Sequence, residues 1–335
     1  MASLKRRLAK YRVWFRELFR FCPISKLKVD RENLFLICGH RGSPVNKPEN
    51  TIPSFERALR EGVNSLETDL CVTKDKEVIL WHDWNPDELV ALLRENGMEP
   101  EVAYKPYFPA LFSDVRNKTS ELKLTEIRKH FNYAKKGEST SVNAHIPTLK
   151  EFINWIKDKS QIKYVFLDIK VPRDEKELVL VILEQLDALM KEFNPSTKFI
   201  IETFYPEVLE IAKNKYPNLN YSLDVEIPPG FIFLPRLHST IKVASKNQNN
   251  VAIILRPRQI TIANWVTFRR LIWYDVRRKL RLNKRSKYKI DFLVGCTINN
   301  KKEMECLIKS GINGMQTDYP RRLTNLSNEY KLRKE

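Results

Sequence analysis

Short apolar runs rich in β-branched and aromatic residues alternate with helix-like stretches along most of the chain. Such runs are typical of buried strands, and eight occur, at 34–38, 65–70, 164–170, 198–204, 221–225, 251–255, 291–298 and 314–318. Amphipathic helices are predicted at 52–62, 149–159, 175–193, 206–215 and 301–311. This alternation predicts parallel strands joined by crossover helices, and eight such units in about 300 residues predict a (β/α)8 (TIM) barrel.

The second predicted strand departs from this alternation. SLETDLCVT is followed by KDK and EVILWHD, which predicts an antiparallel hairpin with its turn at 74–76. Residues 84–147 then separate the hairpin from the third strand, and this stretch is far longer than an ordinary loop. We interpret it as a cap region inserted beside the mouth of the barrel. The predicted organisation is a basic amphipathic helix at 1–30 followed by a barrel domain at 31–330.

Charged and polar residues gather where the predicted strands end. Glu67 and Asp69 alternate on the second strand, so both side chains point to one face. The carboxyl ends of barrel strands form one rim, so the residues at these ends converge. The other members of this set are His40, Arg41, His82, Asp83, Asp168, Lys170 and Asp318.

The residue types in this set suit a phosphate ester held beside a metal ion. The carboxylates of Glu67, Asp69 and Asp168 offer hard oxygen ligands, which favour Mg²⁺ or Ca²⁺ over a softer metal. Arginine binds phosphate with two parallel N–H groups, and lysine adds a point charge. Two imidazoles on opposite sides of the phosphorus share proton removal and proton delivery. The set therefore predicts a divalent-metal and phosphate site.

Short motifs that run in order through residues 34–325 add to this prediction. They are GHRG at 39–42, PENT at 48–51, LETDL at 66–70, HD at 82–83, IPTLKEF at 146–152, LDIK at 167–170, CTINN at 296–300 and GINGMQTDYP at 311–320. This ordered set resembles the glycerophosphodiester phosphodiesterase family, including its lysophospholipase D-like branch.

The resemblance implies a metal-dependent phosphodiesterase that splits glycerophosphodiesters or lysophospholipids into an alcohol and a glycerol phosphate. It makes His40 and His82 the catalytic acid–base pair, without saying which is the acid. The other implied roles are metal ligation by Glu67, Asp69 and Asp168, phosphate binding by Arg41 and Lys170, and support from Glu49, Asp83 and Asp318.

Two positions depart from the family's pattern. Asp168 stands where most members have Glu, although Asp also occurs there in the lysophospholipase D-like branch. Cys296 precedes Thr297 at a place where the family usually carries Trp. The second departure alters the apolar wall that the resemblance implies around the glycerol moiety of the substrate.

The formal net charge of +18 is concentrated in two stretches. Residues 1–28 carry +8 and residues 261–290 carry +9, while the rest of the chain is near neutral. The first stretch has apolar residues at helical spacing, which predicts a helix that lies on an anionic membrane or packs on the barrel. The second interleaves aromatic residues with arginine pairs, which suits lipid headgroups or nucleic acid, and the apolar segment at 227–235 favours lipid.

Composition narrows the location and the competing functions. No apolar run approaches the roughly 20 residues of a membrane span. Five scattered cysteines without a CxxC pair predict no disulfide framework, so we expect a cytoplasmic chain, peripheral on the cytoplasmic membrane face where it touches a membrane. The competing hypothesis is a catalytically silent protein on a barrel scaffold that binds a membrane or, less favoured, nucleic acid.

Overall fold

A computed structural model of the chain describes residues 32–99, 101–203, 205–223, 250–255 and 290–334. The predicted helix at 1–30 and the apolar segment at 227–235 lie outside these residues. The basic stretch at 261–290 also lies outside them, apart from its last residue. The described part contains every residue that the sequence assigned to the predicted site.

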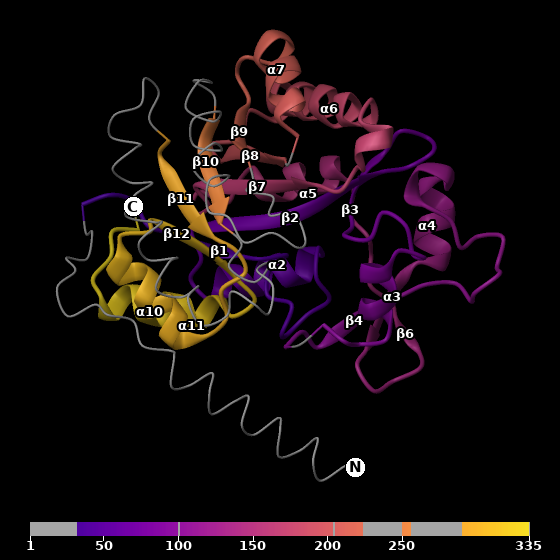
Figure 1. Ribbon diagram of the computed structural model, residues 1–335, viewed down its shortest axis with the longest axis horizontal. Coiled ribbons are helices and arrows are strands. Elements are labelled where there is room, and N and C mark those ends of the chain that lie inside the picture. The colour runs from indigo at the N-terminus through magenta and orange to yellow at the C-terminus, as the bar shows by residue number, and fades with distance from the viewer. Residues whose placement is uncertain (1–31, 100, 204, 224–249, 256–289, 335) are drawn as a thin grey trace, which may run out of the picture.

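Eight parallel strands of the described part form a closed barrel, which confirms the predicted TIM fold (Figure 1). The strands are β1 (Leu36–Gly39), β2 (Ser65–Val72), β7 (Tyr164–Ile169), β8 (Lys198–Thr203), β9 (Asn220–Leu223), β10 (Asn250–Leu255), β11 (Phe292–Gly295) and β12 (Gly314–Thr317). Strand β1 pairs with both β2 and β12, which closes the sheet. Because all eight strands are parallel, their carboxyl ends share one rim.

Helices flank the barrel (Figure 1). They are α2 (Ile52–Arg60), α5 (Leu149–Ile156), α6 (Leu178–Phe193), α7 (Pro206–Lys215), α10 (Lys301–Ser310) and α11 (Pro320–Glu329), with a 3₁₀ turn at Arg173–Glu175. Local chemistry sets their starts: at α5, Thr148 and Glu151 each accept a hydrogen bond from the other's backbone N–H. The sequence pattern predicted five of these helices and missed α11. No described helix is long and apolar enough to cross a membrane.

Strand β2 also pairs with β3 (Val78–Leu80) in the predicted antiparallel hairpin. Leu70 lies opposite Leu80, and Lys76 adopts a positive φ of 65° in the turn. Beyond the ladder, the Trp81 N–H donates to the Asp69 carbonyl at 3.1 Å. The hairpin therefore brings the residues that follow β3 next to the carboxyl end of β2.

The chain between β3 and α5 forms an insertion beside the barrel (Figure 1). Its elements are α3 (Leu89–Glu95), β4 (Tyr104–Tyr107), a 3₁₀ turn (Thr119–Glu121), α4 (Leu124–His130), β5 (Asn132–Lys135) and β6 (Ser141–Val142). Strands β4, β5 and β6 make a small antiparallel sheet. Trp81 packs against Phe108, Phe131 and Tyr133, with ring centroids 5.0–6.1 Å apart. This aromatic cluster joins the insertion to the hairpin.

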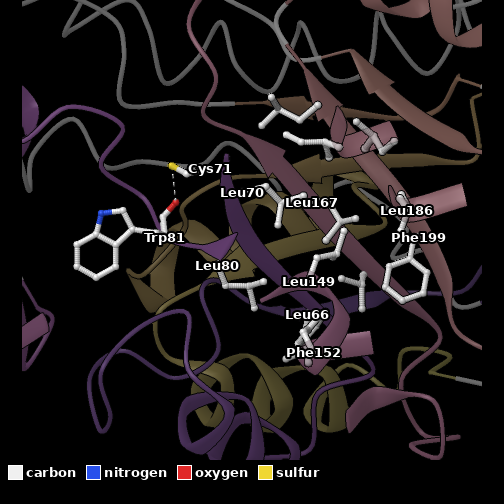
Figure 2. Close-up of a cluster of buried hydrophobic side chains, with 14 of the residues drawn as sticks. Leu66, Leu70, Cys71, Leu80, Trp81, Leu149, Phe152, Leu167, Leu186 and Phe199 are labelled. Atoms are coloured by element: carbon white, nitrogen blue, oxygen red, sulfur yellow. Dashed lines mark hydrogen bonds between the residues drawn. The ribbon is translucent and has the colours of Figure 1, made fainter. Parts of the chain in front are cut away.

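Apolar side chains cover both faces of the barrel sheet, as expected of strands buried on two sides. On the outer face, Leu149 and Phe152 of α5 pack among strand residues that include Leu66 and Leu167 (Figure 2). The inner face carries a second cluster made of Leu36, Cys38, Phe166, Ile200, Ala252, Ile254, Phe292, Val294 and Cys296. Towards the carboxyl ends of the strands, the buried residues become polar, with Glu67, Asp69, Asp168, Glu202 and Gln316.

Most cysteines in the described part of the chain are free, and one is not. Cys38, Cys71 and Cys296 are free and buried, as the scattered pattern predicted. Cys306, however, is disulfide-bonded. The spacing of cysteines along the sequence carries no information on which residues the fold brings together, so a single disulfide was not foreseen. In the described part of the chain, one bonded cysteine beside three free ones is not a disulfide framework, which agrees with the expectation.

The packing of α5 predicts a large effect of truncating Phe152, which is fully buried with its ring centroid 4.9 Å from that of Phe55. Phe152→Ala should lower the free energy of unfolding by about 3–5 kcal/mol, because transfer energy is lost and a cavity remains. Ile211→Ala, on the exposed side of α7, should change it by less than about 0.5 kcal/mol. Urea unfolding followed by circular dichroism measures both, and equally small losses would contradict this packing.

Candidate active site

The polar layer of the barrel lies at the carboxyl ends of its strands. His40 and Arg41 directly follow β1, while Glu67 and Asp69 belong to β2. Asp168 of β7 is the register partner of Asp69 on β2. Neighbouring residues in register point to the same face of a sheet, so these acidic side chains meet inside the barrel.

Three buried carboxylates form the centre of this layer. Oxygen atoms of Glu67, Asp69 and Asp168 lie within 4.8 Å of one another. Burial, together with the charge of Asp69, raises the pKa of Glu67 to about 7. The ammonium of Lys170 reduces the repulsion, with Nζ 2.6 Å from Asp168 Oδ2 and 2.9 Å from Asp69 Oδ1. A crowded set of hard oxygen donors that repel one another fits a divalent cation such as Mg²⁺ or Ca²⁺.

The guanidinium of Arg41 lies among further carboxylates. Its Nε is 2.9 Å from Asp69 Oδ2, and its Nη1 is 2.9 Å from Glu49 Oε2 and 3.4 Å from Glu99 Oε1. The backbone N–H of Arg41 donates to Glu67 Oε2 at 2.8 Å. One residue therefore contacts the acidic centre through both its side chain and its backbone.

A tight turn after β1 directs Arg41 into the site. Arg41 adopts a φ of 52° and Gly42 a φ of 88°. A Cβ at Gly42 would lie 2.5 Å from Ser54 Oγ and 2.7 Å from the Ser54 carbonyl carbon, so a side chain does not fit there. The Ser54 hydroxyl donates to the Arg41 carbonyl at 3.0 Å. This hydrogen bond holds the GHRG motif against the first turn of α2.

His40 is held by a carboxylate at the end of β12. Its Nδ1 lies 2.7 Å from Asp318 Oδ1, and its Nε2 lies 3.9 Å from Glu67 Oε2. Burial alone would lower the pKa of His40, but the charges of Glu67 and Asp318 raise it above its ordinary value. Asn299 holds Asp318 in place, since its Nδ2 donates to Asp318 Oδ2 at 2.5 Å. The site therefore favours the charged form of His40.

His82 is held by a different carboxylate, and its pKa shifts in the opposite direction from that of His40. Its Nδ1 lies 2.7 Å from Asp83 Oδ1, and Asp83 Oδ1 lies 3.1 Å from Arg94 Nε. Burial, with the positive charges of Arg41 and Arg94, lowers the pKa of His82 despite the nearby Asp83. The surroundings of the two histidines thus disfavour protonation of His82 and favour protonation of His40.

Arg94, on α3 of the insertion, connects the two halves of the site. It is 5% exposed, and its guanidinium contacts Asp83, Glu49 and Glu99. Glu49 also pairs with Arg41, so a continuous chain of ion pairs runs from Arg41 to Asp83. The insertion therefore supplies a positive charge beside the carboxylate that holds His82.

Acidic groups outnumber basic ones in this network. Three basic side chains, Arg41, Arg94 and Lys170, face seven carboxylates, a formal excess of four negative charges before the histidines are counted. The carboxylates are Glu49, Glu67, Asp69, Asp83, Glu99, Asp168 and Asp318. A phosphodiester is itself an anion, so its entry requires added positive charge. The charge balance supports the fit of a divalent cation to the three central carboxylates.

The structure brings together all ten residues that the sequence singled out for the site. Sequence reasoning gave no role to Asn50, Asn299, Arg94 or Glu99. Asn50 Nδ2 donates to Asp69 Oδ2 at 2.8 Å, and Asn50 and Asn299 both lie within quoted motifs, so their signal was available. No sequence signal marked Arg94 and Glu99, which lie in the insertion, pair with each other and contact Arg41, Glu49 and Asp83 outside it.

Both departures from the family's pattern lie at this end of the barrel. Asp168 still reaches the carboxylate cluster despite its shorter side chain. Cys296 is 6% exposed and belongs to the apolar cluster on the inner face. The neighbouring Thr297 Oγ1 lies 3.4 Å from His40 Nε2, so this segment borders one of the histidines.

The sequence profile of the Glycerophosphoryl diester phosphodiesterase family matches residues 40–322. The chain belongs to this family. The matched range starts at His40 and includes Asp318, so it contains the whole site described above. The chain is accordingly a phosphoric diester hydrolase of the glycerophosphodiester phosphodiesterase type.

Relatives and solved structures agree with this membership. A glycerophosphodiester phosphodiesterase of Caldanaerobacter subterraneus is 26% identical over 293 residues, which are 87% of this chain and 97% of the relative. A putative glycerophosphoryl diester phosphodiesterase from Silicibacter pomeroyi has a TM-score of 0.67 at 17% identity, over 91% of this chain and 97% of that one. A phosphodiesterase from Oleispira antarctica, solved with the product sn-glycerol-3-phosphate, has a TM-score of 0.59 at 18% identity. The match covers 89% of this chain and 97% of that one. These similarities show a shared fold.

Thermal unfolding tests the carboxylate cluster as a metal site. Mg²⁺ or Ca²⁺ should raise the melting temperature of chelator-treated protein, because an ion that binds only the folded state stabilises it by about 2.7 kcal/mol at a concentration of one hundred times Kd. Glu67→Gln should lose most of this shift. Glu56→Gln, half-exposed on α2, should keep it. A full shift in Glu67→Gln would contradict the assignment.

Proposed function

We propose that this chain cleaves glycerophosphodiesters or lysophospholipids into an alcohol and a glycerol phosphate, using a divalent cation and two histidines as acid and base. The observation that carries the proposal is a pair of aspartate-held histidines beside one carboxylate cluster. His40 lies 2.7 Å from Asp318, and His82 lies 2.7 Å from Asp83. An aspartate on Nδ1 fixes the ring and directs Nε2 to the substrate.

Glu67, Asp69 and Asp168 would hold Mg²⁺ or Ca²⁺, whose charge stabilises the negative charge that develops on the phosphoryl oxygens. Lys170 and Arg41 both contact Asp69, so two further positive groups border the same place. We expect Arg41 to bind phosphate oxygens with its planar fork and Lys170 to add a point charge.

The directions of the two histidine pKa values support an order of proton transfers. The neutral His82 accepts the proton of the glycerol 2-hydroxyl as that oxygen attacks phosphorus. The charged His40 donates its proton to the departing alcohol, which leaves a cyclic phosphate. Water then opens the ring with the two roles exchanged. Environments that push two pKa values apart provide an acid and a base at one pH.

We also propose that the enzyme acts at the anionic, cytoplasmic face of a membrane. Seventeen of its eighteen net charges fall within 1–28 and 261–290. Each basic residue near an anionic surface contributes about 1 kcal/mol of attraction. A lysophospholipid substrate requires such a location, whereas a soluble diester does not. In this proposal, a helix at 1–30 precedes the catalytic barrel domain at 31–330, and nucleic acid is not a partner.

Hydrolysis of glycerophosphocholine and lysophosphatidylcholine tests the reaction. With Mg²⁺ or Ca²⁺ we expect choline release that a chelator abolishes. His40→Ala and His82→Ala should each lower kcat by about 10²-fold or more, as the loss of a general acid or base does. His145→Ala is the control, because that side chain is 59% exposed on the insertion. Inactivity on both substrates with either ion would leave the catalytically silent binding protein as the better hypothesis.

The pH dependence of kcat/KM tests the roles of the two histidines. The acidic limb should lie below the ordinary histidine pKa of about 6.5, where His82 gains a proton, and the alkaline limb above it, where His40 loses one. Arg94→Met removes a positive charge that disfavours protonation of His82, so the pKa of His82 rises and the acidic limb moves to higher pH.

The alkaline limb should stay in place in Arg94→Met, because Arg94 does not contact His40. Arg128→Met, on α4 and part of the same insertion, serves as the control and should leave both limbs in place. A fall in activity without a displaced acidic limb would assign Arg94 only to the folding of the insertion.

A further inference from the structure

Two buried polar residues that the proposed mechanism does not use lie across the interior of the barrel. Gln316 Nε2, on β12, donates a hydrogen bond to Glu202 Oε1, on β8. These strands lie on opposite sides of the closed barrel, with three strands between them in either direction. Glu202 and Gln316 are each 1% exposed. We name this hydrogen-bonded pair the interior pair.

The interior pair lies beside the carboxylate cluster. Glu202 is the register partner of Asp168 on the neighbouring strand β7, so both side chains point into the barrel. Burial raises the pKa of the Cys38 thiol, and the charges of Glu67 and Glu202 raise it further. Both carboxylates therefore act on one side chain of the inner face. Glu202 thus adjoins the cluster at Asp168 and at Glu67.

The interior pair faces the cluster from the deep side, away from the mouth of the barrel. Gln316 comes two residues before Asp318, the carboxylate that holds His40. Side chains two residues apart on a strand share a face and lie about 6–7 Å apart. The register partner of Gln316 is Cys38, which belongs to the apolar cluster on the inner face. Gln316 therefore lies between that apolar cluster and the histidine at the rim.

Two polar atoms at this level lack a hydrogen-bond partner among the residues that the structure describes. They are Oε1 of Gln316 and the hydroxyl of Ser222, which is fully buried. Ser222 is in register with Glu202 on one side and with Ala252 of the inner-face cluster on the other, so its hydroxyl points into the barrel. Buried polar atoms are nearly always hydrogen-bonded, either to protein or to ordered water. The level therefore suits a small donor such as water.

Stability alone does not account for a carboxylate at this position. Taking a charged group out of water is costly, and well-packed apolar side chains of similar volume are often at least as stabilising as a buried ionic group. The next inward-facing residues on β7 and β8 are such side chains, Phe166 and Ile200. A divalent cation changes this balance, because it keeps water ligands that donate hydrogen bonds to acceptors around the site.

We propose that Glu202 and Gln316 accept hydrogen bonds from a water molecule that completes the shell of a divalent cation in the carboxylate cluster. This inference rests on the proposed function, in which the cluster holds Mg²⁺ or Ca²⁺, and adds a fourth carboxylate that acts through water. The described residues whose oxygen atoms meet within 4.8 Å do not include Glu202, which supports a contact through water over direct ligation. Because Gln316 already holds one oxygen of Glu202, the interior pair is preorganised for this contact.

Titration calorimetry with Mg²⁺ or Ca²⁺ alone tests the interior pair without any substrate. Glu202→Gln removes the charge at nearly constant volume, and Gln316→Met removes the carbonyl acceptor without a change of charge. Each should weaken ion binding by about tenfold or more, since loss of a group that supports the ligands of a metal typically costs about 10- to 100-fold in affinity. Glu61→Gln is the matched control and should leave the affinity unchanged, because this buried glutamate pairs with Arg57 at the end of α2.

Luminescence of bound Tb³⁺ distinguishes a contact through water from direct ligation. The lifetimes in H₂O and in D₂O together count the water molecules on the ion. Glu202→Gln should leave this count unchanged, because the residue holds a water ligand and does not occupy a position on the ion. A higher count in Glu202→Gln would make the residue a direct ligand and would overturn the proposal.

The other outcomes of the calorimetry separate this inference from the proposed function. Unchanged affinity in both variants would refute the inference alone, and a lower melting temperature of the chelator-treated variants would then assign the interior pair to the stability of the barrel. An equal loss in Glu61→Gln would refute it by showing an effect of net charge. Failure of the unaltered chain to bind either ion would refute the proposed use of a cation as well. Circular dichroism checks the folding of each variant, and Gln316→Met decides the outcome where Glu202→Gln does not fold.

Discussion

The buried carboxylate of Asp69 is the group on which the rest of the site depends. It pairs with the guanidinium of Arg41 and the ammonium of Lys170, each at 2.9 Å, and accepts a hydrogen bond from Asn50. These contacts hold its pKa well below the ordinary range, although burial alone would raise it. A buried charge is stable only when it is paired, and loss of one partner typically costs about 3–5 kcal/mol. The segments that carry Arg41, Asn50 and Lys170 are therefore held around the one negative charge of Asp69.

The raised pKa of Glu67 shows that burying several carboxylates together is electrostatically unfavourable. Its pKa of about 7 reflects burial beside a second carboxylate, so the metal-free cluster holds one of its acids near the point of protonation. Carboxylates that repel one another in a dry site gain the most from a divalent cation, because the ion removes the repulsion and satisfies the oxygens together. The repulsion that raises the pKa of Glu67 would therefore also favour the binding of a divalent cation.

The insertion takes part in the site as well as covering it. Arg94 reaches from α3 to Asp83 and Glu49, so the position of His82 depends on a segment outside the barrel. Cross-links inside the insertion, from Arg116 and from the ring cluster around Trp81, hold α3 in place. The same short helix also carries the exposed side chains of Leu89 and Leu93. Helix α3 thus contributes both exposed apolar side chains at the surface and a buried charged side chain at the site.

The sequence by itself determined the barrel, the hairpin with its turn at 74–76 and the ten residues expected at the rim. Those features depend on local periodicity and on the rule that parallel strands end together, so neighbouring residues are enough to predict them. It did not determine the pairing of Cys306, the roles of Asn50 and Asn299, or the contacts of Arg94. The sequence also did not predict the directions in which the pKa values of His40 and His82 shift. Each depends on burial and on charges brought together from distant parts of the chain, and only the tertiary structure sets those distances.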